Sequence, residues 1–355
     1  MAARLDRPHP PLAQASGVMR ARFAAQLLSG TPARDPVSVV ERLLAVQAQD
    51  GRGARLAIRA RSTGLTVADT ERALTTERSL LITWLNRGTL HLVRTEDYWW
   101  LHALTTPQLR TGNARRLEQE GVSPDAAERD VKVITRALAG GPLTRYELRD
   151  RVAAAGVPVQ GQALIHLLFL ASLRGHIVRG PMHGIHHAYV LTGDWIGPAH
   201  KVDRDRALTQ LAIRYLAGHG PASDRDLAKW AGISLGVARS ALRSAGESLD
   251  ESGGLSNIKR RGPAPPLPRP RLLGAFEPVL LGWASREPVL PDDSLLVRGG
   301  MFLPFALVRG RAAAGWRLER AGIKIEPFRR VTEAELSALR RDAGAVRRYL
   351  DEPEA

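Results

Sequence analysis

A Gly-Pro segment followed by a hydroxyl residue occurs twice in this chain of 355 residues, and it constrains the fold more than any other feature. The two copies are Gly141-Pro142-Leu143-Thr144 and Gly220-Pro221-Ala222-Ser223. An acid, Glu147 or Asp226, follows three residues after the hydroxyl, which is the spacing of a capping box at the start of a helix. Two such helix starts in similar surroundings predict an internal structural repeat.

The first part of the chain predicts helices that are followed by a β-hairpin. Asp35-Pro36 supplies the cap and the first residue of a helix, whose apolar stripe leads straight into Gln47-Ala48-Gln49-Asp50. Thr66 caps a further helix, and the alternation within residues 79–93 predicts two strands that turn at Arg87-Gly88. Helices followed by a hairpin have the layout of a winged helix.

The same order recurs in the next two parts of the chain. The second unit has predicted helices and short strands over 129–139, 146–155, 162–173, 177–178 and 188–191. The third unit has predicted helices over 207–217, 224–230 and 234–244. Before the first unit we predict a loose arm over 1–17 and a helix over 19–28.

The last part of the chain has a different pattern. A segment with five prolines, 262–270, predicts an extended linker. After it we predict short strands at 280–281, 289–290, 302–308 and 312–318, a tight turn at Arg309-Gly310, and a helix over 333–350 with basic residues on its outer face.

These patterns predict an α+β fold that is mainly α. Tandem winged-helix units occupy residues 1–120, 121–200 and 201–255. A small C-terminal β-sheet or barrel with a terminal helix occupies residues 256–355.

Positive charge is concentrated at the two ends of the chain. The 51 basic and 36 acidic residues give a net charge of +15, and all but five of the basic residues are arginine. Residues 1–120 and 256–355 each carry a net +6, whereas 121–200 and 201–255 carry +2 and +1. A GC-rich genome explains arginine in place of lysine, but the excess over acids favours a polyanionic partner, nucleic acid above all.

The residues that the sequence lacks exclude several classes of protein. The absence of cysteine excludes disulfides, thiolate nucleophiles and cysteine-bound metals. No apolar run reaches about 20 residues, and no apolar stretch begins the chain, so we expect a cytoplasmic, nucleoid-associated protein without membrane contact. Gly51-Arg52-Gly53 lacks the third glycine of a dinucleotide fingerprint, and we expect no cofactor. His183, His186 and His187, with His200 nearby, lack suitable co-ligands, and we predict no metal site.

Several segments that lie far apart in the sequence form one recognisable pattern when they are considered together. They are Val46-Gln47-Ala48-Gln49, Arg78-Ser79 with Thr83-Trp84-Leu85 and Arg87-Gly88-Thr89-Leu90-His91, the 220–232 segment, Ala275-Phe276-Glu277-Pro278, and Val308-Arg309-Gly310 with Gly315-Trp316-Arg317. Together they resemble the winged-helix superfamily of bacterial DNA glycosylases that unhook interstrand crosslinks. Its AlkZ-like branch has Gln-x-Gln where its YcaQ-like branch has Gln-x-Asp, so this chain resembles the AlkZ-like branch over nearly its whole length.

The resemblance implies a fold and an activity. The fold is a set of tandem winged helices around a C-shaped channel. The activity is excision of bulky N7-alkylated purines from double-stranded DNA, associated with self-resistance to genotoxic natural products. Gln47 and Gln49 correspond to the two glutamines of the family motif, and the strands flanking Arg309-Gly310 correspond to a basic hairpin that approaches DNA. We expect the protein to act as a monomer.

Glutamine is compatible with this chemistry. A purine alkylated at N7 is cationic and departs as a neutral base without strong acid catalysis. The remaining tasks are to place a water on C1′ and to stabilise an oxocarbenium-like sugar, and an amide oxygen can accept a hydrogen bond from that water without deprotonating it. Because no lysine lies near the motif in the sequence, a Schiff-base lyase step is not expected, and the predicted product is an abasic site.

The spacing of the two glutamines sets a geometric condition. Residues two apart in a regular helix are separated by about 200°, so Gln47 and Gln49 share a face only if the helix ends or deforms there. Gly51 and Gly53 just beyond the motif are consistent with such an end. The alternative is that one glutamine catalyses while the other bonds the backbone.

Other polar residues have two possible roles. Asp50 is a candidate general base or else pairs with Arg52 or Arg55. Glu277 either stabilises positive charge or binds an arginine, and His91 either contacts the lesion or a phosphate or packs within a strand. The predicted DNA-binding residues are Arg52, Arg55, Arg87, His91, Arg286, Arg309, Arg311 and Arg317. Ser285 precedes Arg286 where relatives often have aspartate, so an ion pair that relies on that acid is not carried over.

Two other functions stay open at this point: a non-enzymatic winged-helix regulator, and a relative that binds lesions without excising them. A regulator places basic residues on the recognition helix that enters the major groove. The predicted helix over 162–173 is almost wholly apolar, and the one over 234–244 offers Arg239 and Arg243. This composition argues against reading of an operator sequence.

Overall fold

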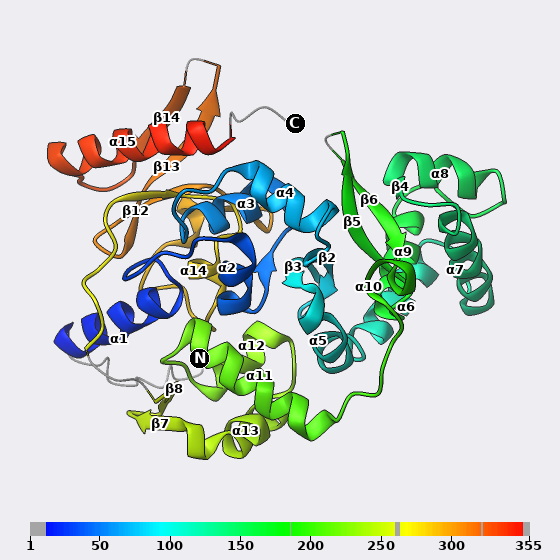
Figure 1. Ribbon diagram of the computed structural model, residues 1–355, viewed down its shortest axis with the longest axis horizontal. Helices are drawn as coiled ribbons and strands as arrows, with labels where there is room; N and C mark the ends of the chain where they lie inside the picture. Colours follow the sequence, from blue (N-terminus) through cyan, green and yellow to red (C-terminus); the bar gives the residue numbers. More distant parts are fainter. Residues whose placement is uncertain (1–11, 185, 260–262, 321, 351–355) are drawn as a thin grey trace, which may run out of the picture.

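The computed structural model describes residues 12–184, 186–259, 263–320 and 322–350. Within them the chain is a mixed α/β structure in which helices pack around small antiparallel sheets (Figure 1). The predicted α+β class is confirmed at this level. In the same residues, none of the helices combines the length and the hydrophobicity that a bilayer-spanning helix requires.

The first part of the chain contains the helix starts that were predicted at Asp35 and Thr66. Its elements are α1 (Leu12–Ala25), α2 (Pro36–Leu43), β1 (Val46–Gln47), α3 (Gly51–Arg59), α4 (Val67–Thr75), β2 (Leu80–Leu85) and β3 (Thr89–Arg94). The side chain of Asp35 accepts a bond from Ser38 N and caps α2, and Thr66 forms a capping box with Asp69 at α4. The hairpin that turns at Arg87-Gly88 is confirmed.

Two predictions for this part are wrong. Residues 1–11 of the expected arm lie outside the described residues, but the chain is helical from Leu12, well before the expected start at Met19. The helix that begins at Pro36 ends at Leu43 instead of running into Gln47. The strand β1 follows and pairs with β3, so Gln47 lies on a strand and Gln49 lies just after it.

The next part has three longer helices and a hairpin. Its elements are η1 (Thr95–Asp97), α5 (Tyr98–Thr105), α6 (Leu109–Gln119), α7 (Pro124–Leu138), β4 (Leu143–Thr144), α8 (Arg145–Ala153), α9 (Ala163–Leu173), β5 (Ile177–His183), β6 (His186–Leu191) and α10 (Thr192–Ile196). The predicted capping box of Thr144 and Glu147 is present at α8. The helix α6 was not predicted from the sequence.

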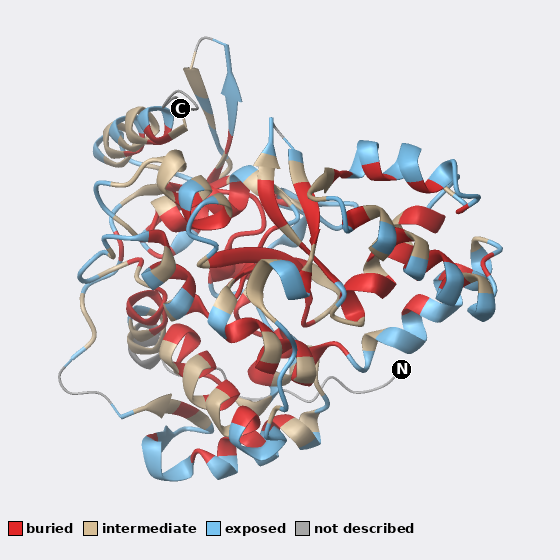
Figure 2. Cartoon of the chain, turned by 45° about the vertical axis from the view of Figure 1, so that its right-hand side comes forward, coloured by how far each residue is buried: buried red, intermediate tan, exposed pale blue. Residues whose placement is uncertain are grey.

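Strands from the first two predicted units form one sheet of six, in the order β1-β3-β2-β5-β6-β4. The units meet where Ile82 of β2 pairs with Arg179 of β5. All six residues of β2 are buried, because β3 and β5 flank it and helices cover the sheet (Figure 2).

The third part is compact and packs against the first. Its elements are α11 (Arg204–His219), α12 (Asp224–Ala231), α13 (Leu235–Ser244), η2 (Gly246–Ser248), β7 (Leu249–Ser252) and β8 (Leu255–Ile258). Ser223 and Asp226 form the predicted capping box of α12. Helix α11 contacts α1, α2 and α5, so one core cluster extends from residues of the first part into the third.

The C-terminal part contains an open sheet. Its elements are β9 (Arg271–Leu273), α14 (Pro278–Leu281), η3 (Asp293–Leu295), β10 (Val297–Arg298), β11 (Met301–Phe302), β12 (Phe305–Val308), β13 (Arg311–Glu319), β14 (Gly322–Pro327) and α15 (Glu333–Leu350). The main sheet has the order β14-β13-β12-β9. Of the predicted sheet or barrel, the described residues form the sheet and not the barrel, because β14 and β9 are edges of this sheet and do not pair with each other.

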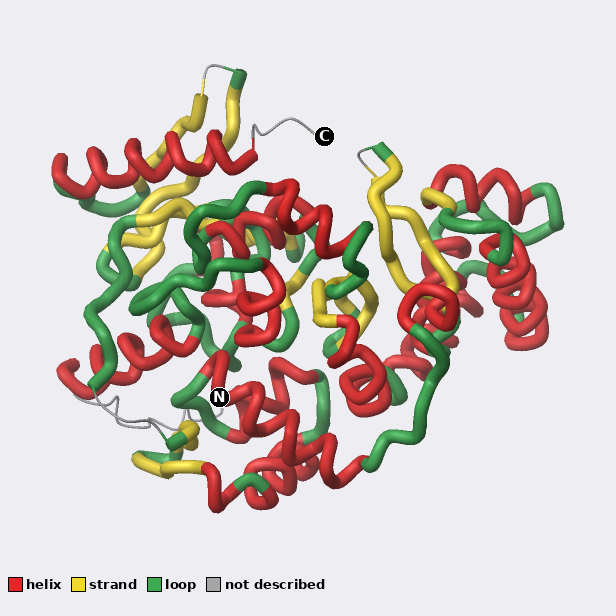
Figure 3. Tube along the Cα trace, in the orientation of Figure 1, coloured by secondary structure: helices red, strands yellow, loops and turns green. Residues whose placement is uncertain are grey.

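The turn at Arg309-Gly310 and the terminal helix are confirmed, with Arg340, Arg341, Arg347 and Arg348 exposed on α15. The strand predicted at 280–281 is wrong, because Pro278 opens the short helix α14 instead. Residues 289–290 form a turn and the end of a loop, not a strand. The hairpin of β13 and β14 extends beyond the rest of the sheet (Figure 3).

Candidate active site

The glutamine motif lies on a short extended segment between two helices. Leu44, fully buried, takes a left-handed backbone conformation with φ 64° directly after α2. This conformation ends the helix and redirects the chain. Gln47 then pairs with His91 of β3, and Ala48 N donates to Leu90 O at 2.7 Å.

The extended backbone brings the two glutamines together. Gln47 ends β1 and Gln49 follows two residues later, before α3 begins, so the separation of about 200° that a regular helix would impose is absent. The Gln47 amide nitrogen donates to Gln49 Oε1. Gln47 is 7% exposed whereas Gln49 is exposed, so the pair links the interior to the surface.

Arg87 completes the surroundings of Gln47. It lies in the turn between β2 and β3, and its guanidinium donates to Gln47 Oε1 at 3.0 Å. The same guanidinium donates to Trp230 O, at the end of α12, at 2.7 Å. Gln47, Arg87 and His91 line one small pocket. Its other lining residues are Ala45 directly before β1, Trp230 of α12, and Pro278, Leu281 and Gly282 at α14.

His91 is a neutral hydrogen-bond acceptor toward this pocket. Its Nδ1 lies 2.8 Å from Thr89 O, and because a carbonyl can only accept, the neutral ring carries its proton on Nδ1. Burial, assisted by the charge of Arg87, lowers the pKa of His91 to about 3. The Nε2 atom is therefore unprotonated near neutral pH, so through it His91 can only accept a hydrogen bond.

Asp50 has a structural role at the start of α3. Its Oδ1 accepts a bond from Gly53 N, as an N-cap does. Neither predicted partner, Arg52 or Arg55, bonds its carboxylate. A Cβ atom at Gly53 would lie 2.4 Å from Ala275 O, so glycine allows the 275–278 segment to approach the cap closely.

A buried polar network supports the segment that forms one wall of the pocket. Glu277 accepts from Arg61, and both side chains are fully buried. Arg61 also donates to Gln26 Oε1 at 3.0 Å, and Gln26 Nε2 donates to Pro278 O at 3.2 Å and to His219 Nδ1 at 3.1 Å. Of the two roles considered for Glu277, the structure shows the binding of an arginine.

The buried histidines make stability dependent on pH. Burial lowers the pKa of His91 and of His219 to about 3, whereas both bind protons in the unfolded chain near the ordinary pKa of 6.5. The unfolded state therefore gains protons first as pH falls below 6.5, and folding stability decreases. From pH 7.5 to 5.5 we expect a loss of about 1 kcal/mol per histidine, measured by urea unfolding. Equal unfolding free energies at the two pH values would contradict neutral burial.

Two of the predicted DNA-binding arginines lie at opposite extremes of exposure. Arg55 is 8% exposed, forms an ion pair with Glu71, and lies 3.2 Å from His187 Nε2 on β6. It therefore holds α3 to α4 and to the β5–β6 hairpin. Arg52 is exposed on the first turn of α3, near Gln49 in the chain.

The other predicted DNA-binding residues divide between two regions. Arg286 forms an ion pair with Asp293 at 2.9 Å and stacks on Phe302, and its charge contributes to lowering the pKa of Arg87. Arg309 forms an ion pair with Glu335 of α15 at 2.6 Å, and the turn after it packs against Phe23. Arg311 and Arg317 are exposed on β13. The turn at Arg309-Gly310 joins β12 to β13, and the hairpin that extends beyond the sheet is β13–β14, which carries Arg317 (Figure 3).

The histidines considered for a metal have different neighbours. His183 lies 4.0 Å from Glu147, His186 packs edge-on against Tyr146, and His187 contacts Arg55. Among the described residues, no three His, Asp or Glu side chains are grouped so that they could hold a metal ion.

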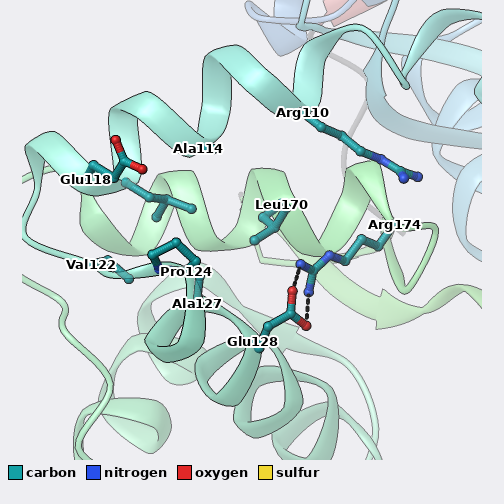
Figure 4. A pocket seen from close by; sticks show the side chains of 10 residues that line it. Arg110, Ala114, Glu118, Val122, Pro124, Ala127, Glu128, Leu170 and Arg174 are labelled. Atoms are coloured by element: carbon teal, nitrogen blue, oxygen red, sulfur yellow. Dashed lines mark hydrogen bonds and ion pairs between the residues drawn. The ribbon is translucent and has the colours of Figure 1, made fainter.

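A second pocket lies apart from the glutamines, between α6, α7 and α9 (Figure 4). Arg174 bonds Glu128 at its edge with one N–O distance of 2.9 Å. Apolar residues such as Leu170 line it together with the charged side chains of Arg110 and Glu118. None of the predicted site residues lines this pocket.

Sequence reasoning missed the contribution of α12 to the site. Trp230 and Gly232 stand in one of the segments quoted above, yet no role was predicted for them. The backbone of a lysine also reaches this site, because Lys229 O accepts a bond from Arg87 at 3.4 Å. The Lys229 side chain itself is exposed on α12.

Comparisons of the sequence and of the structure with known proteins all find DNA glycosylases. The sequence profile of the family described as DNA glycosylase AlkZ-like matches residues 40–349. The chain belongs to the AlkZ-like DNA glycosylase family, and as a member it is an enzyme. A Streptomyces sahachiroi protein named interstrand DNA cross-link repair glycosylase is 25% identical over 352 residues, which cover 92% of this chain and 94% of that protein.

A solved structure shows the same fold. It is that of the Streptomyces sahachiroi DNA glycosylase AlkZ, with a TM-score of 0.74 at 23% sequence identity. The alignment covers 94% of this chain and 96% of that one. The family that the sequence resembles is confirmed by the profile match over residues 40–349.

Proposed function

We propose that this protein is a monofunctional DNA glycosylase that hydrolyses the N-glycosidic bond of bulky N7-alkylated purines in duplex DNA. The observation that carries the proposal is the hydrogen-bonded pair of Gln47 and Gln49 on an extended segment, beside Arg87 and neutral His91. The related protein named as an interstrand cross-link repair glycosylase supports crosslinks as a further substrate. The biological role that fits is self-resistance to a genotoxic natural product.

Because an N7-alkylated purine departs as a neutral base, the enzyme has two tasks: to place a water on C1′ and to stabilise the oxocarbenium-like sugar. Amide oxygens and N–H groups can orient a water toward C1′. The exposed Gln49 is the member of the pair that meets DNA, and the buried Gln47 fixes it from behind. Gln47 and Gln49 do not ionise, so the chemistry relies on the cationic base rather than on a strong acid.

The finer architecture is part of the same proposal. Each of three helix sets is followed by a hairpin, namely β2–β3, β5–β6 and β7–β8. We take these as tandem winged helices that line a channel for duplex DNA, with Arg52, Arg286 and the β13–β14 hairpin at its walls. The protein acts as a monomer in this scheme.

Alkaline cleavage tests the function. The protein is incubated with a duplex that carries one bulky N7-alkylguanine, and half of the sample is then treated with hot alkali. We expect strand scission in the alkali-treated half alone, because the product is an abasic site. Scission without alkali would show a lyase step, for which Lys229 is the first residue to test. Tight sequence-specific binding with no scission of any adduct would favour a regulator.

Binding to undamaged duplex is expected to depend strongly on salt. The net +6 at each end of the chain predicts contacts with several phosphates, each of which releases counterions. For about four contacts, affinity falls on the order of 10²-fold between 50 and 200 mM salt, measured by fluorescence anisotropy. An affinity that stays constant over this range would show that the charged ends are not the DNA surface.

A further inference from the structure

The hydrogen bonds of Arg87 are directed at the protein, although the sequence predicts a contact with DNA. Its guanidinium donates to Trp230 O at 2.7 Å, to Lys229 O at 3.4 Å and to Gln47 Oε1 at 3.0 Å. Burial, with the charge of Arg286 as a second cause, lowers its pKa. Arg87 thus connects the turn between β2 and β3, the end of α12 and the glutamine motif.

The backbone around Arg87 holds it in this position. Asn86 precedes it with φ 54° and Gly88 follows with φ 80°, so the turn has a defined left-handed course. A Cβ atom at Gly232 would lie 2.5 Å from Asn86 O. The turn therefore packs directly on the end of α12, and the guanidinium has little freedom to swing toward a phosphate.

Arginine fixes the direction of the Gln47 amide. A guanidinium can only donate hydrogen bonds, so the Gln47 oxygen must face Arg87 and the amide nitrogen must point away. That nitrogen donates to Gln49 Oε1. The Gln49 oxygen is therefore turned toward Gln47, and both N–H groups of Gln49 are left for water or DNA. The donors run in one direction, from Arg87 through Gln47 to Gln49.

Without Arg87, the Gln47 oxygen loses its donor, and the opposite orientation of the amide is no longer excluded. His91 is the cross-strand neighbour of Gln47 on β3, and such neighbours have Cβ atoms about 5 Å apart. The unprotonated Nε2 of His91 is an acceptor, which favours the amide nitrogen of Gln47 over its oxygen. Arg87 opposes this flip because it requires an oxygen.

We infer that Arg87 is a positioning residue that sets the amide orientation of both Gln47 and Gln49, and that it does not serve as a phosphate contact. The inference rests on the proposed glycosylase function. In it, Gln49 presents its N–H groups to the substrate, and the remaining lone pair of an amide oxygen accepts from the attacking water.

The test compares Arg87→Met and Arg87→Lys with Arg149→Met, which removes an equal charge from an exposed position on α8. Single-turnover excision is measured at saturating protein, and the Kd for undamaged duplex is measured across salt. For Arg87→Met we expect a loss of roughly 30- to 100-fold in rate, typical of a displaced reacting group, with Kd and its salt slope unchanged. Arg87→Lys keeps the charge but cannot bond Trp230 O and Gln47 Oε1 together, so it loses part of the rate. Arg149→Met changes neither quantity.

A wild-type rate for Arg87→Met would overturn the inference. So would a weaker Kd with a salt slope reduced by about 1 and a normal saturated rate, because that is the signature of a phosphate contact. Thermal unfolding of each variant is recorded. If Arg87→Met is unstable, the excision rate of Arg87→Lys tests the inference instead, and a wild-type rate in that variant would overturn it.

A readout that does not need activity separates the inference from the proposed function. In protein labelled with ¹⁵N at glutamine side chains, the Gln47 amide signals are assigned by their absence in Gln47→Ala. We expect them to shift in Arg87→Met and Arg87→Lys but not in Arg149→Met. If wild-type protein excises no adduct, the proposed function fails, while unchanged Gln47 signals in the Arg87 variants would overturn the inference.

Discussion

Replacing Gln47 by alanine is expected to lower the single-turnover rate of N7-alkylguanine excision by about 10²–10³-fold, the range found when one preorganised polar group is removed from an active site. The substitution removes the donor to Gln49 and the acceptor for Arg87 together. Gln49 is then free to rotate, so its amide no longer holds the water in line with C1′. The measurement is the rate of appearance of alkali-labile sites at saturating protein.

The matched control for this prediction is Gln119→Ala, which removes an exposed glutamine at the end of α6. It is expected to excise at the wild-type rate. Duplex affinity is expected to change little in Gln47→Ala, since Gln47 is 7% exposed. If a folded Gln47→Ala protein formed alkali-labile sites at the wild-type rate, the proposed mechanism would be contradicted.

Replacing Glu277 by alanine is expected to lower the free energy of unfolding by about 3–5 kcal/mol, which is the usual cost of leaving one member of a buried ion pair alone. Glu277 and Arg61 both have side chains that are 0% exposed. Without the carboxylate, the Arg61 charge stays buried with Gln26 Oε1 and Ala57 O as its acceptors. Urea unfolding at pH 7.5 measures the change.

A double substitution separates the ion pair from the space that it fills. Arg61→Met combined with Glu277→Leu removes both charges and keeps most of the volume. Such replacements are often close to neutral, so we expect the double variant to be more stable than Glu277→Ala. If Glu277→Ala unfolds at the wild-type urea concentration, Glu277 does not neutralise Arg61 in the folded state.

Local signals in the sequence predicted much of the fold. The capping boxes at Thr144 and Ser223 and the cap at Asp35 each mark a helix in the structure, because these interactions lie within one turn of chain. The turn at Arg87-Gly88 was predicted for the same reason. The start of α1 at Leu12 was missed. Residues 280–281 were wrongly predicted as a strand, because a helix of four residues that begins at a proline shows little helical periodicity.

The geometry of the site depends on contacts between distant residues, which the sequence could not supply. The strand β1 has two residues and exists because β3 pairs with it more than 40 positions along the chain. The Gln-x-Gln pattern and the resemblance predicted a role for Gln47 and Gln49, and the structure brings their side chains together, whereas a regular helix through the motif would have separated them. Nor could an arginine-rich sequence distinguish buried Arg55 and Arg61 from exposed Arg52.

The central claim is that this protein releases an intact alkylated base and leaves an abasic site. The most direct measurement is mass spectrometry of the small molecules released from a duplex with one bulky N7-alkylguanine, with alkali-labile sites counted in the same sample. We predict free alkylated guanine in an amount equal to the alkali-labile sites, with no strand cut before alkali. Absence of the free base, or strand cuts that form without it, would contradict the account.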